Sequence, residues 1–204
     1  MPYYRTEVLL VRRKIGIFSG TFDPVHMGHI AFALQASDVC VLDEVILLPE
    51  KHPRLKQPTP IEQRCDMLKL STDGQPKLRV ACLDMPQFTV HDTLPVLQSM
   101  FADSDLYMLL GSDAVLTFAY RWPGIKDLLQ QTTIVVGMRQ ADTEQEVLGV
   151  LQACEKDYGV SVRYAILPSP HAHLASTNIR MGKHKIEDVH PNVADYIKQH
   201  QLYL

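Results

Sequence analysis

Two histidines three positions apart, His26 and His29, are the residues of this 204-residue chain best placed to do chemistry. Residues three apart on a helix project to the same side of one turn, so both imidazoles would face one ligand. Gly28 lies between them and has no side chain, which lets a ligand approach the backbone closely. Two imidazoles at the start of a helix would suit a phosphate chain that gains negative charge during a reaction.

The residues around the pair predict a strand, a turn and a helix. The apolar run 15–18 has the composition of a strand, and the apolar segment 30–34 reads as a helix. Gly20 and Pro24 lie in the turn between them, where backbone N–H groups and a helix dipole would meet. An H-x-x-H pair alone is more often a surface feature or a chance match, and this junction is the context that a functional interpretation needs. Zinc ligation by the pair is a weaker alternative.

Composition places the chain among ordinary globular proteins. With 46% hydrophobic and 21% charged residues over 204 positions, we expect a single domain, residues 1–204. The formal net charge of −3 argues against a general polyanion binder, so no nucleic acid partner is expected. No apolar run approaches the length of a membrane span, and residues 1–5 lack the apolar region of a signal peptide. These features predict a cytoplasmic protein without a membrane partner.

Cysteine usage predicts no disulfide framework. The four cysteines are widely spaced, form no C-x-x-C pair and each lie in an apolar segment, so we expect buried free thiols. They are Cys40, Cys65, Cys82 and Cys154.

Apolar runs alternate with helical patterns along the chain. Strands are expected at 15–18, 44–49, 78–83, 106–110, 133–138 and 160–167, and helices at 61–70, 89–101, 143–158 and 191–204. About six strands alternating with helices predict an α/β fold, a doubly wound, Rossmann-like parallel sheet with right-handed crossovers. Open sheets of this kind bind ligands at the carboxyl ends of their strands.

Two of the expected strands end in segments that carry polar side chains. The loop 50–60 contains Lys51, Arg54 and Lys56, which could hold a substrate phosphate or form a solvated basic loop. Gly111 and Asp113 follow another strand. Asp113 could accept hydrogen bonds from a ribose or hold a magnesium-bound water, and it could equally be an ordinary helix cap. Both alternatives stay open in each case.

Two further segments could contact a nucleotide. Trp122, the only tryptophan, could stack on a planar heterocycle or anchor the core. Near the carboxyl end, Ser176 or Thr177 could cap a helix whose N–H groups face an anion, with Arg180 one turn on. Arginine suits bidentate contact with phosphate oxygens. Alone, this segment would be interpreted as an ordinary helix cap. The phosphate-binding interpretation is better supported because the chain also contains the histidine pair.

These segments together resemble a known family. Residues 20–29, GTFDPVHMGH, resemble the G-x-F-x-P-x-H-x-G-H signature of the nucleotidyltransferase superfamily. Residues 175–180 are similar to the I-S-S-T-x-I-R box of the bacterial nicotinate-nucleotide adenylyltransferases, with Ala175 replacing the first Ser. Residues 89–94 resemble that family's Y-T-x-x-T-L segment, and Gly111 to Trp122 its G-x-D…W pattern. The resemblance covers nearly the whole chain. One departure is the substrate loop P-P-H-[KR], which residues 51–56 do not reproduce.

The resemblance implies transfer of the adenylyl group from ATP to nicotinate mononucleotide, giving deamido-NAD and pyrophosphate, with Mg²⁺ bridging phosphate oxygens. It implies catalytic roles for His26, His29 and Arg180, and helices from about residue 175 that complete the ATP site. The implied ATP-binding residues are Gly20, Thr21, Phe22, His26, Gly28, His29, Gly111, Asp113, Ser176, Thr177 and Arg180. The implied acceptor-binding residues are Lys51, Arg54, Lys56, Thr93 and Trp122.

Other functions compete with this one. The same transfer could use nicotinamide mononucleotide or, with less support, phosphopantetheine. A class I aminoacyl-tRNA synthetase fragment would need a K-M-S-K-S-like loop and a longer chain. A non-catalytic nucleotide-binding regulator would bind ATP without releasing pyrophosphate.

Overall fold

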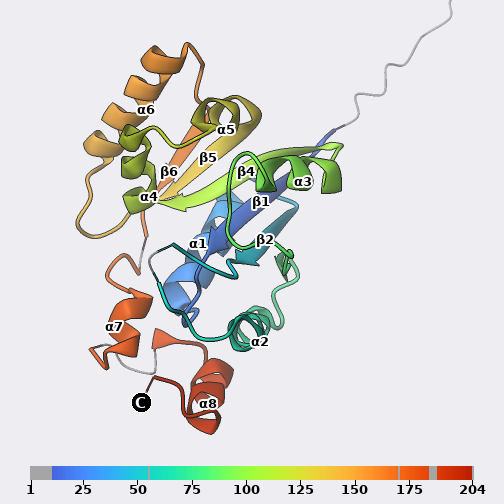
Figure 1. Ribbon diagram of the computed structural model, residues 1–204, viewed down its shortest axis with the longest axis vertical. Helices are drawn as coiled ribbons and strands as arrows, with labels where there is room; N and C mark the ends of the chain where they lie inside the picture. Colours follow the sequence, from blue (N-terminus) through green and yellow to red (C-terminus); the bar gives the residue numbers. More distant parts are fainter. Residues whose placement is uncertain (1–10, 55, 170, 184–187, 204) are drawn as a thin grey trace, which may run out of the picture.

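A six-stranded parallel sheet forms the centre of the molecule, as the sequence predicts (Figure 1). The computed structural model describes residues 11–54, 56–169, 171–183 and 188–203. The strands are β1 (Arg13–Gly20), β2 (Glu44–Pro49), β3 (Leu78–Val80), β4 (Ser104–Gly111), β5 (Thr132–Gly137) and β6 (Tyr164–Leu167). The helices are α1 (Met27–Val39), α2 (Ile61–Thr72), α3 (Thr93–Met100), α4 (Ser112–Leu116), η1 (Thr117–Tyr120), α5 (Ile125–Gln131), α6 (Glu144–Tyr158), α7 (Ser176–Arg180) and α8 (Pro191–Gln199).

The strand order is β3-β2-β1-β4-β5-β6, so the direction of winding reverses between β1 and β4. These two strands are hydrogen-bonded neighbours, with Ile17 opposite Met108. At such a reversal the segments that follow the two strands diverge toward opposite faces of the sheet. The crevice that opens outside their carboxyl ends is where open α/β sheets bind ligands.

Both faces of the sheet are covered by helices, which explains the continuous apolar strands. Side chains alternate along β1: Ile15 and Ile17 enter one core cluster, whereas Phe18 enters the other. The Phe18 cluster includes residues of α1, α2 and α8, and the other includes residues of α3, α5 and α6. Among the described residues, none of the helices is long and apolar enough to cross a membrane.

Two strands and a helix are shorter than the sequence predicts. The strand expected at 78–83 ends at Val80, and the one expected at 160–167 begins at Tyr164. The helix expected from Thr89 begins at Thr93, because Thr89 Oγ1 accepts the Asp92 N–H at 3.0 Å and closes a turn ahead of it. Helix α5 was not predicted from the sequence.

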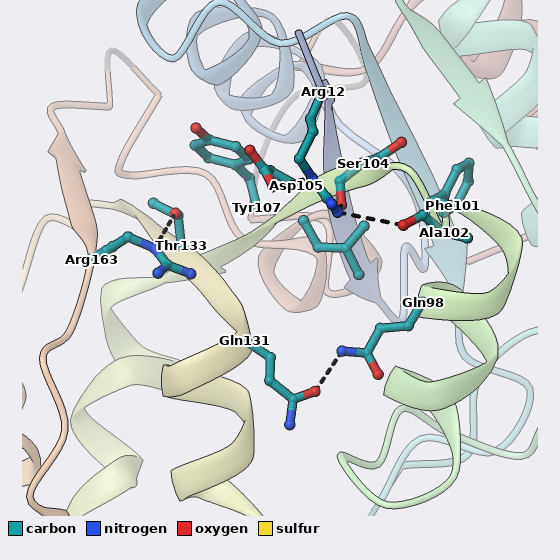
Figure 2. A pocket seen from close by; sticks show the side chains of 11 residues that line it. Arg12, Gln98, Phe101, Ala102, Ser104, Asp105, Tyr107, Gln131, Thr133 and Arg163 are labelled. Atoms are coloured by element: carbon teal, nitrogen blue, oxygen red, sulfur yellow. Dashed lines mark hydrogen bonds and ion pairs between the residues drawn. The ribbon is translucent and has the colours of Figure 1, made fainter. Parts of the chain in front are cut away.

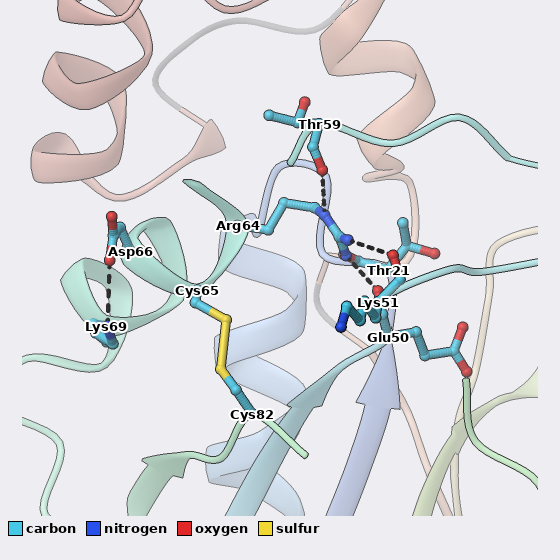
Figure 3. Close-up of a disulfide and its surroundings, with 9 residues drawn as sticks. All are labelled: Thr21, Glu50, Lys51, Thr59, Arg64, Cys65, Asp66, Lys69 and Cys82. Carbon is cyan, nitrogen blue, oxygen red and sulfur yellow. Dashed lines mark hydrogen bonds and ion pairs between the residues drawn. A yellow bond between two sulfur atoms is a disulfide. The ribbon is translucent and has the colours of Figure 1, made fainter. Parts of the chain in front are cut away.

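The expectation of four free thiols is wrong for one pair. Cys65 on α2 and Cys82, just after β3, form a disulfide, whereas Cys40 and Cys154 are free (Figure 3). Helix α2 packs against β3, which brings together two residues 17 positions apart. Spacing alone does not show this contact, because it arises from the docking of a helix on an edge strand.

Candidate functional site

A cleft of about 640 Å³ lies at the carboxyl ends of the central strands. Its walls come from the loop between β1 and α1, the ends of β4 and β5, and the segment that includes α7. Segments from opposite ends of the chain therefore share one cavity. All predicted ATP-binding residues line it: Gly20, Thr21, Phe22, His26, Gly28, His29, Gly111, Asp113, Ser176, Thr177 and Arg180.

The two histidines are fixed by the start of α1. His26 is the N-cap residue, and its backbone N–H donates to Nδ1 of His29 at 3.1 Å. The backbone N–H of His29 in turn donates to the His26 carbonyl at 2.9 Å. The two rings stack with centroids 3.7 Å apart. A Cβ at Gly28 would lie 3.0 Å from the His26 ring and 3.3 Å from Cβ of His171, so the packing needs glycine there.

The protonation state of His29 follows from these contacts. Burial lowers its pKa well below the ordinary value of 6.5, and the neighbouring charges of His26, Arg139 and Lys56 lower the pKa further. The ring is therefore neutral at pH 7. Because Nδ1 accepts a backbone hydrogen bond, the ring proton is on Nε2. A neutral imidazole with this tautomer can donate a hydrogen bond to a phosphate oxygen.

Helix α7 is hydrogen-bonded to the loop that precedes the histidines. Ser176 Oγ donates to the Pro24 carbonyl at 2.9 Å, and Nη1 of Arg180 donates to the Asp23 carbonyl. Nη2 of Arg180 also donates to Oγ1 of Thr177 at 3.1 Å. The predicted helix cap by Ser176 or Thr177 is wrong, because Ala175 is the N-cap residue and the Ser176 hydroxyl is engaged by the loop.

The ends of β4 and β5 contribute an ion pair that the sequence analysis did not identify. Nε of Arg139 lies 3.5 Å from Oδ1 of Asp113, and Nη1 of Arg139 donates to the Leu174 carbonyl at 3.3 Å. A Cβ at Gly111 would displace the Asp113 carboxylate from its place beside Arg139. Arg139 is two residues past the end of β5. The rule that ligands bind at the carboxyl ends of strands would have pointed to it.

Two of the predicted acceptor-binding residues line the cleft, Lys56 and Trp122. Nζ of Lys56 donates to Oγ1 of Thr21 at 3.1 Å. The Trp122 ring packs edge-on against Phe118, with centroids 5.0 Å apart, so the indole is both part of the cleft wall and packed on the core.

The other three predicted acceptor-binding residues lie outside the lining of the cleft. Nζ of Lys51 pairs with Asp84 at 3.2 Å, and Nε of Arg54 donates to Gln87 at 3.2 Å. Thr93 is 3% exposed, and its hydroxyl accepts the Thr89 N–H at 3.0 Å. Sequence position in the basic loop could not distinguish Lys51 and Arg54 from Lys56.

A buried arginine on α2, to which no role was assigned from the sequence, holds two loops whose residues line the cleft (Figure 3). Arg64 is 0% exposed, and its guanidinium donates to four backbone carbonyls. The acceptors are Thr59 at 2.7 Å, Thr21 at 2.7 Å, Glu50 at 2.8 Å and Lys51 at 3.2 Å. Burial lowers its pKa. Arg64 thus ties the loop after β2 to the loop after β1.

A second cavity, of about 430 Å³, lies at the opposite, amino-terminal edge of the sheet (Figure 2). It is lined by two arginines, but both are engaged by the backbone. Nη2 of Arg12 donates to the Ser104 carbonyl at 2.7 Å, and Nη2 of Arg163 donates to the Gln130 carbonyl at 3.4 Å. Arg163 thus contacts the carboxyl-terminal end of α5, where a cation is favourable, and Arg12 contacts the start of β4. The cleft with the histidines remains the better candidate.

Comparisons with known proteins agree with this geometry. A model of the family described as cytidylyltransferase-like matches residues 17–182, which contain both halves of the cleft. This chain belongs to that family. A probable nicotinate-nucleotide adenylyltransferase from Neisseria meningitidis serogroup B is 32% identical over 203 residues, covering 94% of this chain and 98% of the relative. A relative with the same description from Dehalococcoides mccartyi is 30% identical over 206 residues, covering 95% and 98%.

Solved structures share the fold. Plasmodium falciparum nicotinic acid mononucleotide adenylyltransferase in complex with NaAD has a TM-score of 0.76 at 18% identity, covering 94% of this chain and 97% of the other. A putative nicotinate-nucleotide adenylyltransferase from Vibrio parahaemolyticus has a TM-score of 0.65 at 18% identity, covering 94% and 95%. The nucleotidyltransferase fold predicted from the sequence is confirmed.

Proposed function

We propose that this enzyme transfers the adenylyl group of ATP to nicotinate mononucleotide, forming deamido-NAD and pyrophosphate in NAD biosynthesis. The observation that carries the proposal is the shared cleft, in which the stacked histidines and Arg180 lie together although they are far apart in the sequence. The relatives described as nicotinate-nucleotide adenylyltransferases, which this chain matches over nearly its full length, support the choice of acceptor.

The chemistry requires positioning more than activation. A 5′-phosphate oxygen of the mononucleotide attacks the α-phosphorus of ATP, a new P–O bond forms, and the bond to the β-phosphate oxygen breaks with its electrons leaving on pyrophosphate. The attacking phosphate is already an anion, so no protein nucleophile is needed. In this proposal the Nε2–H of His29 donates to an oxygen of the transferred phosphorus, and His26 supports the stacked ring.

The cations of the cleft would hold the remaining charge. Arg180, with Ser176 and Thr177, is assigned to the β,γ end of the triphosphate. Lys56 and Arg139 also face the cleft, and both are close enough to lower the pKa of His29. Donors fixed around developing charge are effective because they need no reorganisation during the reaction.

We also propose that ATP is used with Mg²⁺. Among the described residues, three carboxylates line the cleft, those of Glu50, Asp113 and Asp142. Asp142 accepts a hydrogen bond from Ser112 Oγ at 2.6 Å, whereas the Asp113 side chain is 64% exposed. No group of three or more His, Cys, Asp or Glu residues in the described part of the chain could hold a metal alone. This donor set fits Mg²⁺ carried mainly by phosphate oxygens, with Asp113 contacting it through water; bound there, it would neutralise phosphate charge.

The proposed location is the cytoplasm, where disulfides are rare unless they are redox-active. Cell fractionation tests the location. Alkylation of thiols in intact cells, followed by mass spectrometry, reports whether Cys65 and Cys82 are joined there.

The test of the proposed function is pyrophosphate release from ATP and Mg²⁺ with a panel of acceptors. Nicotinate mononucleotide, nicotinamide mononucleotide and phosphopantetheine are supplied separately, and the adenylylated product is identified by mass. We expect the highest kcat/KM with nicotinate mononucleotide. Faster turnover of another acceptor would overturn the substrate assignment, and ATP binding without pyrophosphate release would indicate a regulator.

A further inference from the structure

The Asp23 carboxylate joins three segments of the chain beneath the cleft. It is 4% exposed and lies three residues before His26. Oη of Tyr203 donates to its Oδ1 at 2.6 Å, and the backbone N–H of Thr59 donates to its Oδ2 at 3.4 Å. Nη1 of Arg180 lies 3.8 Å from Oδ2 and donates to the Asp23 carbonyl oxygen. The carboxyl end of the chain, the loop after β2 and α7 therefore meet at one side chain.

The Tyr203 hydroxyl has a defined direction. Oγ1 of Thr59 donates to Tyr203 Oη at 3.3 Å, which leaves the phenolic proton directed at Asp23. Burial, and then the hydrogen bond to Asp23, raise the pKa of Tyr203, so the hydroxyl stays protonated throughout the working pH range. A short hydrogen bond from a neutral hydroxyl to a buried carboxylate is among the stronger ones in proteins.

We infer that Tyr203 is a positioning residue for the adenylyl transfer, acting through Asp23 on Arg180 and on the histidine loop. The inference rests on the proposed function. By satisfying Oδ1, the Tyr203 hydroxyl holds the carboxylate in a rotamer whose Oδ2 is only loosely paired with Arg180. Without that hydroxyl, the buried carboxylate would turn toward the guanidinium to regain a charge-assisted hydrogen bond. Arg180 would then be drawn away from the triphosphate.

The test compares two tyrosines at the carboxyl end of the chain. Tyr203→Phe removes only the hydroxyl, and Tyr196→Phe is the matched control, because Tyr196 Oη contacts Asp66 at 3.5 Å and does not line the cleft. For Tyr203→Phe we expect the KM for ATP to rise about tenfold, while the KM for nicotinate mononucleotide stays within about twofold. Tyr196→Phe should change neither. A merely structural role would move both constants together or lower Tm without this split.

A double-mutant cycle tests the route through Arg180. If Tyr203 acts through that guanidinium, Tyr203→Phe should have little further effect on the KM for ATP in an Arg180→Lys background. Additive effects, or an unchanged KM for ATP in folded Tyr203→Phe, would overturn the inference. Should Tyr203→Phe melt below the assay temperature, Thr59→Val removes the donor that orients the same hydroxyl and should raise the KM for ATP by a smaller factor.

A failure of the positioning role can be distinguished from a failure of the proposed reaction. Wild-type protein that releases no pyrophosphate with any acceptor would refute the proposed reaction. The affinity of a non-hydrolysable ATP analogue, compared between wild type, Tyr203→Phe and Tyr196→Phe by calorimetry, would still test the positioning role. Equal affinities in all three would refute it.

Discussion

Replacing Arg64 by methionine should destabilise the fold far more than replacing an exposed arginine. The guanidinium donates to four backbone carbonyls and is 0% exposed, so its removal leaves buried acceptors without a partner. Each hydrogen bond to a charged group contributes about 1.5–3 kcal/mol. Simple addition of four such bonds overshoots, because the loops can relax and admit water. A buried acceptor left without a partner costs about 1–3 kcal/mol, so a loss of about 3–5 kcal/mol is expected for Arg64→Met once relaxation has satisfied some of the four carbonyls.

The assay is equilibrium unfolding in urea followed by circular dichroism, with the free energy of unfolding taken from linear extrapolation. The matched control is Arg79→Met. Arg79 is 47% exposed, and its Nε contacts Glu44 at 2.6 Å, so this surface pair should contribute less than about 1 kcal/mol. Arg64→Lys keeps a charge but has a different donor geometry, and should lie between the wild type and Arg64→Met.

The result that would refute this reasoning is a loss below about 1 kcal/mol for Arg64→Met, equal to that of the control. The four carbonyls would then be satisfied by water as well as by the guanidinium. A second consequence is kinetic, since Arg64 ties the loop after β1 to the loop after β2. Arg64→Lys should raise KM for both substrates, in contrast to the ATP-specific effect expected for Tyr203→Phe.

Three further predictions concern His29 and the disulfide. His29→Ala should lower kcat by about 10²–10³ with an unchanged fold, measured by pyrophosphate release and circular dichroism, because it removes a donor aimed at developing charge; normal turnover would refute the assigned role. Because the pKa of His29 is lowered in the folded protein, the unfolded chain binds a proton at this position that the folded protein does not. The free energy of unfolding should therefore fall as pH drops below about 6.5, toward the folded-state pKa. His29→Asn should show a smaller fall between about pH 7 and pH 5 in urea titrations, and equal falls would contradict the shift. Cys82→Ser opens a loop whose ends are 17 positions apart and should lower the unfolding free energy by about 3 kcal/mol without reductant. Excess dithiothreitol should bring wild type to the same value, and a variant as stable as oxidised wild type would argue against the bond.

The sequence predicts the sheet well, because its inner strands are buried on both faces and read as apolar runs. The run 44–49 is an example, since it matches β2 at both ends. A proline, Pro49, ends the strand. The length of a short edge strand was overestimated. β3 has only three residues, Leu78–Val80, whereas the apolar pattern continues to residue 83. The disulfide between Cys65 and Cys82 depends on how α2 docks, and that docking is not written in the spacing of cysteines.

Residues of the candidate site could be predicted when they follow a strand or belong to a long motif. They were harder to predict when the side chain bonds only backbone atoms. His29 and Arg180 were found because their neighbours form recognisable patterns. Arg64 was not, because its partners are carbonyl oxygens whose directions depend on the conformations of two loops. Lys51 and Lys56 have the same side chain in the same loop, yet only Lys56 turns toward the cleft.

The cations around the cleft have two roles: some fix the backbone of the loops, and others face the cleft. Those that face the cleft explain how a protein with a net charge of −3 can hold a triphosphate. Arg64 donates its hydrogen bonds to loop carbonyls, so its charge fixes backbone and is screened by it. Arg180 does both, since it holds the Asp23 carbonyl while lining the cleft. A guanidinium has five N–H donors, so contacts to the loop and to Thr177 leave donors for phosphate oxygens. The loop 20–26 is thereby tied to the guanidinium that we propose binds the nucleotide, so small displacements of Asp23 should change the affinity for ATP.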